Sequence, residues 1–477
     1  MSAVREGIGA LGLVVALALG ACGATPSPDP SPDPGLDGES SPAAARAQAY
    51  VEAALEGRAF AMLRELCEVA PARLSGSANG QKAVEWGLAT MRAIGLSNVR
   101  AEPVMVPHWV RGEPERCELL GEDDAVVEDL QVLALGGSEA TPPGGVVAEL
   151  VMVRSFEELA ARGEEARGKI VFFNRPMPRI FANTVRAYGQ AVPQRTSGAV
   201  EASRVGAVFA LVRSMTTRID DHPHTGAMVY QDGVPRIPSA AISTLDAESL
   251  AARIERGERV RLRIALHCAT LPDVESANVV GEVPGGDLAH EIVTVGGHLD
   301  SWDAGQGAQD DGAGIAHTLE AARILVASGL RPRRTLRFVL FANEENGLRG
   351  GHAYRAAHAH ESHFAAIESD AGADVPLGFG TTAKGARFAA LREPLHALEP
   401  FGMGALTPGG GGADIGPLAE LGAELFGLTV ISHRYFDYHH SALDHIDSVN
   451  ERALALGAAA VAWLAATLAE IELPPRT

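Results

Sequence analysis

Apolar residues in the second half of the chain follow two patterns, short continuous runs and longer stretches at helical spacing. Runs bounded by polar or glycine-rich segments predict buried strands, and the helical spacing predicts helices. The run Leu336–Phe341 is so apolar that both faces of its strand should be covered, as in a central parallel strand. The pattern predicts an α/β domain with strands at Ile292–Val295, Leu336–Phe341, Ala365–Ile367 and Leu425–Leu428, a helix from Gly312 through Ile315, Leu319, Ala322 and Val326, and a last helix through Leu454–Leu468.

The first half of the chain has a different texture. Helical spacing predicts helices between Tyr50 and Ile94, interrupted at Gly76–Gly80, and Val104–Trp109 predicts a strand. Beyond Glu118, short β-type runs alternate with Gly and Pro breaks. This change predicts an inserted α/β module at residues 119–275 that divides the main domain into residues 43–118 and 276–477. Its expected strands are Val146–Val153, Ile170–Phe173, Val208–Val212 and Ala240–Ile242, with a helix near Gly198–Gly206.

The amino-terminal residues have the composition of a targeting segment and a tether. The apolar segment Ile8–Leu19 is too short to span a membrane and is typical of a signal peptide. It ends in Leu19-Gly20-Ala21-Cys22, which resembles the bacterial lipoprotein box, so residues 1–21 are interpreted as a lipoprotein signal peptide and Cys22 as the lipidated residue. Residues 22–42, rich in Pro, Ser and Asp, predict a solvated tether. We expect an exported protein, lipid-anchored to a bacterial membrane on its periplasmic or cell-surface side. The alternative is a plain signal peptide with a chance cysteine.

Charge and cysteine content exclude several classes of protein. The 477 residues carry 60 acidic and 40 basic side chains, a net charge of -20 that disfavours nucleic acid as a partner. The four cysteines have no paired short spacing, so neither a zinc ribbon nor a disulfide framework is indicated. Cys67 lies among apolar positions and is interpreted as a buried free thiol. A disulfide between Cys117 and Cys268, at the neck of the inserted module, stays open because spacing does not establish connectivity.

Side chains of the kinds that bind metals follow four of the predicted strands. Ligands of open α/β sheets bind outside the carboxyl ends of strands, which is where these side chains should lie. Each cluster is weak alone, since paired glutamates usually lie on solvated faces and a His-His pair is more often structural. Together they predict one concave site of imidazoles and carboxylates without thiolate, which suits zinc or a related divalent ion in a hydrolytic site. The clusters are His298 to Asp311, Asn343 to Asn346, Glu368 to Asp370 and Tyr435 to Asp444.

These motifs resemble those of the dizinc exopeptidases that include bacterial leucyl aminopeptidases and glutamate carboxypeptidases. The resemblance spans nearly all of residues 43 to 472 and includes segments outside the clusters, at Pro103–Glu113, His222–Gly226 and Tyr230–Pro235. It implies an α/β fold of the zinc-peptidase (phosphorylase/hydrolase-like) type, a mixed sheet flanked by helices, with the inserted module as a protease-associated domain. The motifs that carry it are Gly-Gly-His298-Leu-Asp300-Ser-Trp, Asp310-Asp311-Gly-Ala-Gly, Asn-Glu344-Glu345, Glu-Ser-Asp370 and His440-Ser-Ala-Leu-Asp444.

The resemblance assigns roles to these residues and implies a cofactor of two zinc ions per chain. Asp310 would bridge the metals, His298 and Asp370 would complete one, and Glu345 and His440 the other. Asp300 would orient the imidazole of His298, and the Asp310–Asp311 peptide would be cis. Glu344 would be the general base that activates a metal-bridged water against a peptide bond. His439 is the alternative to His440, but the spacing from His440 to Asp444 matches the family pattern.

Several alternatives remain open. The motifs are shared by aminopeptidases and carboxypeptidases, so they do not choose between these activities on small peptides. A non-catalytic binding protein is disfavoured because all ligand positions and the base are present, and a glutaminyl-cyclase-like transferase because the insert argues against it. We expect a homodimer by resemblance. Two further interpretations concern side chains outside the ligand set: Asp414, after a glycine run, as a residue that can meet substrate, and His317, His352, His358, His360 and His363 as surface groups.

Overall fold

The computed structural model describes residues 41–475. The predicted signal peptide, Cys22 and the tether up to residue 40 lie outside the described residues. The first described helix, α1, begins at Pro42, within one residue of the start expected from the sequence.

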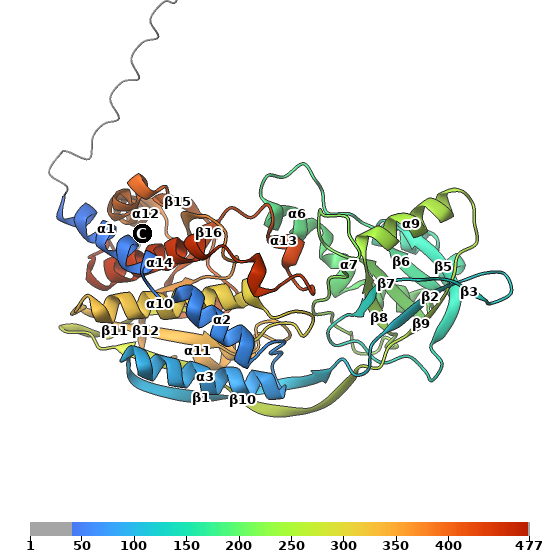
Figure 1. The fold of residues 1–477 in the computed structure, drawn as a ribbon, viewed down its shortest axis with the longest axis horizontal. Coiled ribbons are helices and arrows are strands. Elements are labelled where there is room, and N and C mark those ends of the chain that lie inside the picture. The colour runs from blue at the N-terminus through green and yellow to red at the C-terminus, as the bar shows by residue number, and fades with distance from the viewer. Residues whose placement is uncertain (1–40, 476–477) are drawn as a thin grey trace, which may run out of the picture. The chain divides into compact units, whose positions relative to one another are not determined.

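A mixed sheet of eight strands carries the predicted ligand clusters (Figure 1). Its order is β1-β10-β12-β11-β13-β16-β14-β15. The neighbouring strands β12, β11, β13 and β16 run parallel, so their carboxyl ends meet at one edge of the sheet. The bounds are β1 Ser97–Val110, β10 Ala269–Val283, β11 Leu288–His298, β12 Arg334–Phe341, β13 Ser362–Glu368, β14 Pro376–Thr381, β15 Ala405–Pro408 and β16 Glu424–Val430.

Strand β12 shows how the apolar runs build this sheet. All of its residues are buried, as predicted. Phe338 and Leu340 pack into the core on one face and Val339 and Phe341 on the other, because side chains alternate across a strand. Strand β12 is parallel to β11 but antiparallel to β10, so the expectation of a parallel strand holds on one side only.

Helices cover both faces of this sheet. On one face α10 and α14 pack against each other and against β11 and β12, while α3 packs against β10 and β1 and α1 packs on the outer side of α14 and α10. On the opposite face lie α11 and the short helix η3. Helix α14 is long and apolar enough to span a membrane by length and composition, but in the described structure its residues from Ala453 to Ala469 are buried in this core. The bounds are α1 Pro42–Leu55, α2 Ala59–Val69, α3 Ala78–Ile94, α10 Ala313–Ala327, α11 Arg349–Ala357, α12 Gly385–Leu395, η2 His396–Phe401, η3 Gly416–Leu421, α13 Tyr435–Tyr438, η4 Ile446–Ser448 and α14 Glu451–Glu470.

The entry into α10 follows the expectation from the sequence. A short kinked segment, η1 (Ala308–Gly312), carries Asp310 and Asp311 in non-helical backbone conformations directly before α10. The peptide bond between these two residues is cis, as the family resemblance implied.

A second sheet of eight strands, with order β3-β2-β9-β5-β6-β7-β8-β4, forms the second-sheet module, residues 116–265. The four strands expected from the apolar runs are present, and β5 to β8 run parallel. Strand β10 begins at Ala269 and its first residues pair with β1, so the predicted boundary at residue 275 falls inside the first sheet. The bounds are β2 Arg116–Leu120, β3 Val126–Asp129, β4 Val132–Ala134, β5 Val146–Val153, α4 Phe156–Ala161, α5 Gly163–Ala166, β6 Ile170–Phe173, α6 Thr184–Ala191, α7 Pro193–Thr196, α8 Gly198–Arg204, β7 Phe209–Arg213, β8 Ser239–Ile242, α9 Thr244–Glu255 and β9 Arg261–Ala265.

The cysteines of the described residues are free thiols. Cys67 is buried, as expected, and Cys117 and Cys268 are buried without forming the disulfide that spacing left open. The thiol of Cys268 donates instead to the carbonyl of Ser138 at 3.1 Å. Burial raises the pKa of Cys67 and Cys268 to about 11, so both are neutral thiols at neutral pH.

The interpretation of five histidines as surface groups is wrong for three of them. His317, His358 and His363 are buried, whereas His352 and His360 are exposed. His317 shares a hydrogen bond with the hydroxyl of Ser369 at 2.8 Å, and a ring nitrogen of His363 bonds the carbonyl of His358 at 3.1 Å. Each imidazole is buried beside a polar partner from another element. The linear sequence does not reveal these partners.

Candidate metal centre

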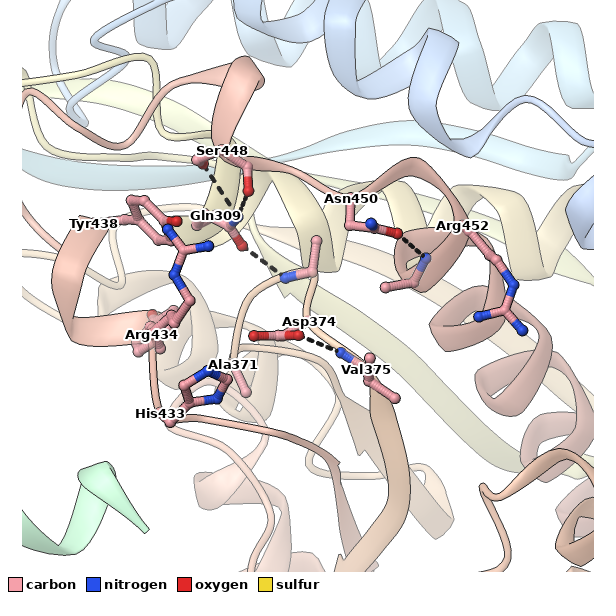
Figure 2. Close-up of a pocket in the computed structure, with 13 residues that line it drawn as sticks. Gln309, Ala371, Asp374, Val375, His433, Arg434, Tyr438, Ser448, Asn450 and Arg452 are labelled. Atoms are coloured by element: carbon pink, nitrogen blue, oxygen red, sulfur yellow. Dashed lines mark hydrogen bonds between the residues drawn. The ribbon is translucent and has the colours of Figure 1, made fainter. Parts of the chain in front are cut away.

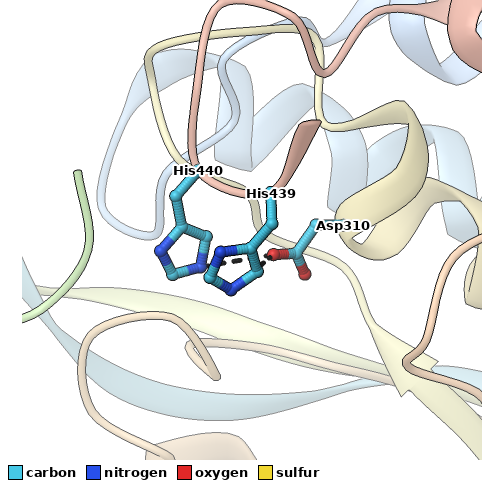
Figure 3. A group of neighbouring side chains, drawn as sticks. All are labelled: Asp310, His439 and His440. Carbon is cyan, nitrogen blue, oxygen red and sulfur yellow. Dashed lines mark ion pairs between the residues drawn. The ribbon is translucent and has the colours of Figure 1, made fainter. Parts of the chain in front are cut away.

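Asp310 lies at the centre of the predicted ligands. One carboxylate oxygen, Oδ1, is 3.1 Å from Nε2 of His298, and the other, Oδ2, is 3.2 Å from Nε2 of His440. Figure 3 shows His440 and His439 directed at the same carboxylate. Asp310 therefore occupies the position between two imidazoles that a bridging ligand requires.

Glu345 and Asp370 complete the group of five. Oε2 of Glu345 is 3.0 Å from Nε2 of His440, and Oδ1 of Asp370 is 3.7 Å from Nε2 of His298. Among the described residues, His298, Asp310 and Glu345 form a triad with ligand atoms within 4.8 Å of one another; His440 and Asp370 belong to two overlapping triads that also contain His439 or Asp311. The structure thus brings together all five metal ligands expected from the sequence.

The fold explains why residues so far apart in the chain meet. His298 is the last residue of β11, Glu345 follows β12, Asp370 follows β13, and His440 lies on the loop after β16 and α13. These four strands are parallel neighbours, so each delivers its ligand to the same edge of the sheet.

Two further side chains, His439 and Asp311, reach the same space. The imidazole of His439 stacks on that of His440 at a centroid distance of 3.5 Å, but its Nε2 is 3.7 Å from Asp310, farther than that of His440. Both oxygens of Asp311 accept backbone N–H groups, from His298 at 3.0 Å and from Gly314 at 2.9 Å. Asp311 is therefore committed to holding the backbone, which favours the predicted set over these two neighbours.

Charge coupling within the cluster is strong. Burial by itself would lower the pKa of the two imidazoles, but the surrounding carboxylates outweigh it, raising the pKa of His440 to about 9 and that of His298 well above its usual value. Burial by itself would raise the pKa of Asp310, yet hydrogen bonds from the same imidazoles hold that pKa well below the usual range. The site therefore stabilises an ionised carboxylate at its centre.

Glu344 stands beside the ligands but does not belong to any of the triads. Burial raises the pKa of Glu344 well above its ordinary value, and the negative charges of Asp370 and Glu345 add to the effect. Its backbone N–H donates to Oδ1 of Asp300 at 3.0 Å. A carboxyl group with a raised pKa next to a cluster of candidate metal ligands has the properties of a group that accepts and returns a proton.

Asp300 contacts both His298 and Glu344, in a way that differs from a simple carboxylate–imidazole pair. Nδ1 of His298 lies 3.0 Å from the backbone carbonyl of Asp300 and 3.9 Å from its carboxylate. The carboxylate is engaged mainly by the N–H of Glu344. Residue 300 thus orients the imidazole through its carbonyl and ties the Glu344 loop to it through its side chain.

Arg73 supports the cluster, and the sequence pattern did not single it out. It is fully buried, and its guanidinium donates to the carbonyls of Leu299, Gln306 and Gly307 at 2.6 to 2.8 Å. It therefore pins the loop between His298 and Asp310. The available signal was a cation directly before Leu74 in an otherwise apolar segment, which is uncommon unless the charge is used.

The donor set fits a divalent cation. Oε1 of Glu345 is buried and has no hydrogen-bond partner among residues 41–475. Ionised carboxylates accept hydrogen bonds and cannot donate them, so Asp310, Glu345 and Asp370 cannot form hydrogen bonds with one another. Their negative charges need a positive charge among them. Imidazole and carboxylate ligands without thiolate suit zinc.

Arg195 approaches this cluster from the second-sheet module. Its Nη1 lies 3.2 Å from Nδ1 of His440 and 3.4 Å from the carbonyl of Thr225. The side chain is buried, its Nε has no hydrogen-bond partner, and no carboxylate within residues 41–475 forms an ion pair with it. The sequence pattern gave no signal for Arg195, because its role depends on its position beside His440 in the folded structure.

A cavity of about 330 Å³ lies beside the loop that follows Asp370. Figure 2 shows it between the segment Ala371–Val375, the residues His433 to Tyr438 and the start of α14. Gln309, next to Asp310, forms part of its wall and donates to Ser448 at 3.0 Å. One wall of the cavity therefore belongs to the segment that carries Asp310.

Asp414 does not face an open site. It is 1% exposed, and burial together with the charge of Glu368 raises its pKa well above the usual value. The expectation that Asp414 meets substrate is therefore not supported by its position. Trp302, a second neighbour of the ligands, is also buried and packs against Trp109 and His440.

Comparisons with known proteins identify relatives over most of the chain. The sequence pattern of Peptidase family M28 matches residues 278–465. Carboxypeptidase Q of Mus musculus is 37% identical over 425 residues, which cover 88% of each chain. Carboxypeptidase Q of Homo sapiens is 37% identical over 419 residues, 87% of this chain and 86% of that protein.

Two solved structures extend the comparison to the fold. A peptidase M28 precursor from Shewanella amazonensis superposes with a TM-score of 0.86 at 35% identity, covering 91% of this chain and 99% of the other. A zinc aminopeptidase from Bacillus subtilis superposes with a TM-score of 0.62 at 21% identity over 85% and 93% of the two chains, a likeness of fold alone. The resemblance expected from the motifs is confirmed.

Proposed function

Because the chain belongs to peptidase family M28, a family of zinc exopeptidases, we propose that it is a dinuclear zinc exopeptidase that hydrolyses dipeptides or short peptides. The observation that carries the proposal is the carboxylate of Asp310, placed between His298 at 3.1 Å and His440 at 3.2 Å.

The ligands divide into two sets around this carboxylate. His298 and Asp370 would hold one zinc ion and Glu345 and His440 the other, with Asp310 shared between them. When bound, the ions supply Lewis acidity at the scissile carbonyl and lower the pKa of the attacking water.

Glu344 would act as the general base. It would take a proton from the attacking water as the water oxygen bonds to the carbonyl carbon, and it would give that proton to the leaving amine as the C–N bond breaks, so that water adds across the peptide bond and no covalent enzyme intermediate is needed. The raised pKa of Glu344 supports this role, because the group must hold the proton between the two transfers. Asp300 would keep the Glu344 loop in register with His298.

We place the activity on the carboxypeptidase or dipeptidase side. Arg195 is a buried guanidinium beside His440 without a carboxylate partner within the described range. A peptide whose last residue follows the scissile bond carries a free carboxylate close to the reacting carbonyl, and such an anion would complete the hydrogen bonding of Arg195. Aminopeptidase activity, which the fold also supports in other proteins, needs no such cation.

The remaining proposals concern the other parts of the chain. The second-sheet module would be a protease-associated domain, and two chains would form a homodimer. Cys22 would be lipidated and anchor the protein to a bacterial membrane after export. Replacing Cys22→Ser should release the protein into the soluble fraction; unchanged partitioning into membranes would contradict lipidation.

A panel of blocked peptides tests the activity. The zinc-loaded protein should cleave dipeptides and N-acetylated peptides with a free carboxyl terminus, and it should spare the corresponding carboxyl-terminal amides. Cleavage of the amides, with N-acetylated peptides left intact, would instead establish an aminopeptidase. Cleavage of neither group by protein of verified zinc content would overturn the peptidase assignment.

A further inference from the structure

His224 of the second-sheet module contacts the loop that carries the metal ligand His440. Its Nδ1 lies 2.7 Å from the backbone carbonyl of His439, and the N–H of Thr225 donates to the carbonyl of His440 at 2.9 Å. Two successive residues of the module thus bind two successive carbonyls of the loop. The second-sheet module therefore holds a part of the metal centre that the first sheet does not supply.

The loop needs such contacts because His440 lies in neither a helix nor a strand. Helix α13 ends at Tyr438, and the backbone φ of His440 is 61°, in the left-handed region that a residue with a side chain adopts at a cost. That conformation persists only where surrounding structure fixes it. The two hydrogen bonds from His224 and Thr225 are contacts that do so.

His224 is itself rigidly anchored. Its backbone N–H donates to the hydroxyl of Ser214 at 2.8 Å, and that hydroxyl donates to the carbonyl of Ile242 at 2.7 Å, at the end of β8. The side chain is 1% exposed. The backbone of residue 224 is thus attached to the core of the second sheet, and its imidazole connects the loop to that fixed point.

Folding alone does not account for an imidazole at this position. Burial lowers the pKa of His224 to about 4, so the ring is neutral at neutral pH, and a carbonyl acceptor requires the hydrogen on Nδ1. The other ring nitrogen, Nε2, is buried without a hydrogen-bond partner within residues 41–475. An apolar ring would avoid that unsatisfied nitrogen, so the donor at Nδ1 is the feature that an imidazole adds.

We propose that His224 is a positioning residue that fixes the metal ligand His440 through the carbonyl of His439. The consequence is that the affinity of the zinc ion held by Glu345 and His440 depends on a side chain of the second-sheet module, as outer contacts of metal ligands commonly require. Since His440 is a metal ligand only under the proposed function, the inference rests on that function.

Metal affinity tests the proposal without measuring turnover. In the full-length chain, His224→Phe keeps a ring of similar size but loses the donor, and His224→Asn keeps an amide N–H near the position of Nδ1. Titration of Zn²⁺ against a competing chelator should show that His224→Phe weakens one of two bound ions by roughly 10- to 100-fold and that His224→Asn restores most of the affinity. The visible spectrum of bound Co²⁺ should change for the same ion only.

A buried histidine elsewhere provides the matched control. A ring nitrogen of His363 also bonds a backbone carbonyl, that of His358, at 3.1 Å. Because this contact does not involve the loop of His440, His363→Phe should leave both zinc affinities unchanged. Ser214→Ala, which removes the anchor but keeps the imidazole, should weaken the same ion in the same direction. Wild-type affinities in both His224→Phe and Ser214→Ala would overturn the positioning role and leave the proposed function intact. Failure of the unchanged protein to bind zinc would overturn both.

Discussion

The carboxylate of Asp444 accepts the backbone N–H of Asp310 at 3.1 Å, across 134 positions of sequence. Its second oxygen accepts the N–H of Gln309 at 2.6 Å. The loop that ends in Asp444 therefore fixes the backbone of the proposed bridging ligand, and the same loop carries His440. One segment of chain both supplies a ligand and orients another.

Replacing Asp444→Asn should weaken the site through this contact. One amide N–H group would then face a backbone N–H, which leaves buried donors unpaired at a cost of about 1–3 kcal/mol. We expect a lower free energy of unfolding in denaturant titration and a lower zinc affinity. Asp447→Asn, at an exposed position in the following short helix η4, should change stability by less than about 0.5 kcal/mol. Equal effects of the two changes would contradict the role of Asp444.

Replacing Glu344→Gln should abolish most turnover while leaving the ligands in place. Loss of a general base typically costs about 10²- to 10⁴-fold in rate. We expect kcat to fall by that order and zinc content, measured by atomic absorption, to remain at the wild-type value. The exposed Glu85→Gln serves as the control. Retained activity in Glu344→Gln would show that another group accepts the proton.

The two adjacent histidines should differ in their effect on zinc content. His440→Ala removes the imidazole that lies 3.0 Å from Glu345 and 3.2 Å from Asp310, so the chain should retain about one zinc ion after dialysis. His439→Ala removes the more distant imidazole and should retain both. The reverse pattern would make His439 the ligand.

Arg195→Ala should weaken the binding of substrates that have a free carboxyl terminus. If Arg195 binds the terminal carboxylate, its loss should raise KM for dipeptides by roughly 10- to 100-fold, as expected for a hydrogen bond between charged groups. The preference for free over amidated carboxyl termini should fall with it. Arg204→Ala, on the surface of the same module, is the control. An unchanged preference would remove the reason for favouring a carboxypeptidase.

Stability should fall in acid in part because His317 is buried as a neutral ring. Burial lowers its pKa from 6.5 to about 4, so between these values the unfolded chain binds a proton that the folded chain does not. This contribution is lost as the pH falls from 6.5 through 4. His317→Asn, which does not titrate, should therefore lose about 1–2 kcal/mol less than the wild type between pH 7 and 5 in denaturant unfolding.

The sequence by itself determined the strands of the first sheet and predicted which candidate ligand residues lie close together. Apolar runs such as Leu336–Phe341 place strands where the structure has them, because burial on both faces requires continuous apolar residues. Each of the predicted ligands follows such a strand. Since parallel neighbours bring their carboxyl ends to one edge, His298, Asp310, Glu345, Asp370 and His440 meet as expected.

Tertiary structure alone decided which side chains support the site. The local sequence does not show what Arg73, Arg195 and His224 contact, because their partners lie on distant elements of the fold. His317 looked like a surface group because helical spacing does not show that α14 covers the outer side of α10. The periodicity of apolar residues indicates which face of a helix or strand packs on the core. The hydrogen bonds and the burial of a polar side chain depend instead on which distant element packs against it, and those contacts form only when the chain folds.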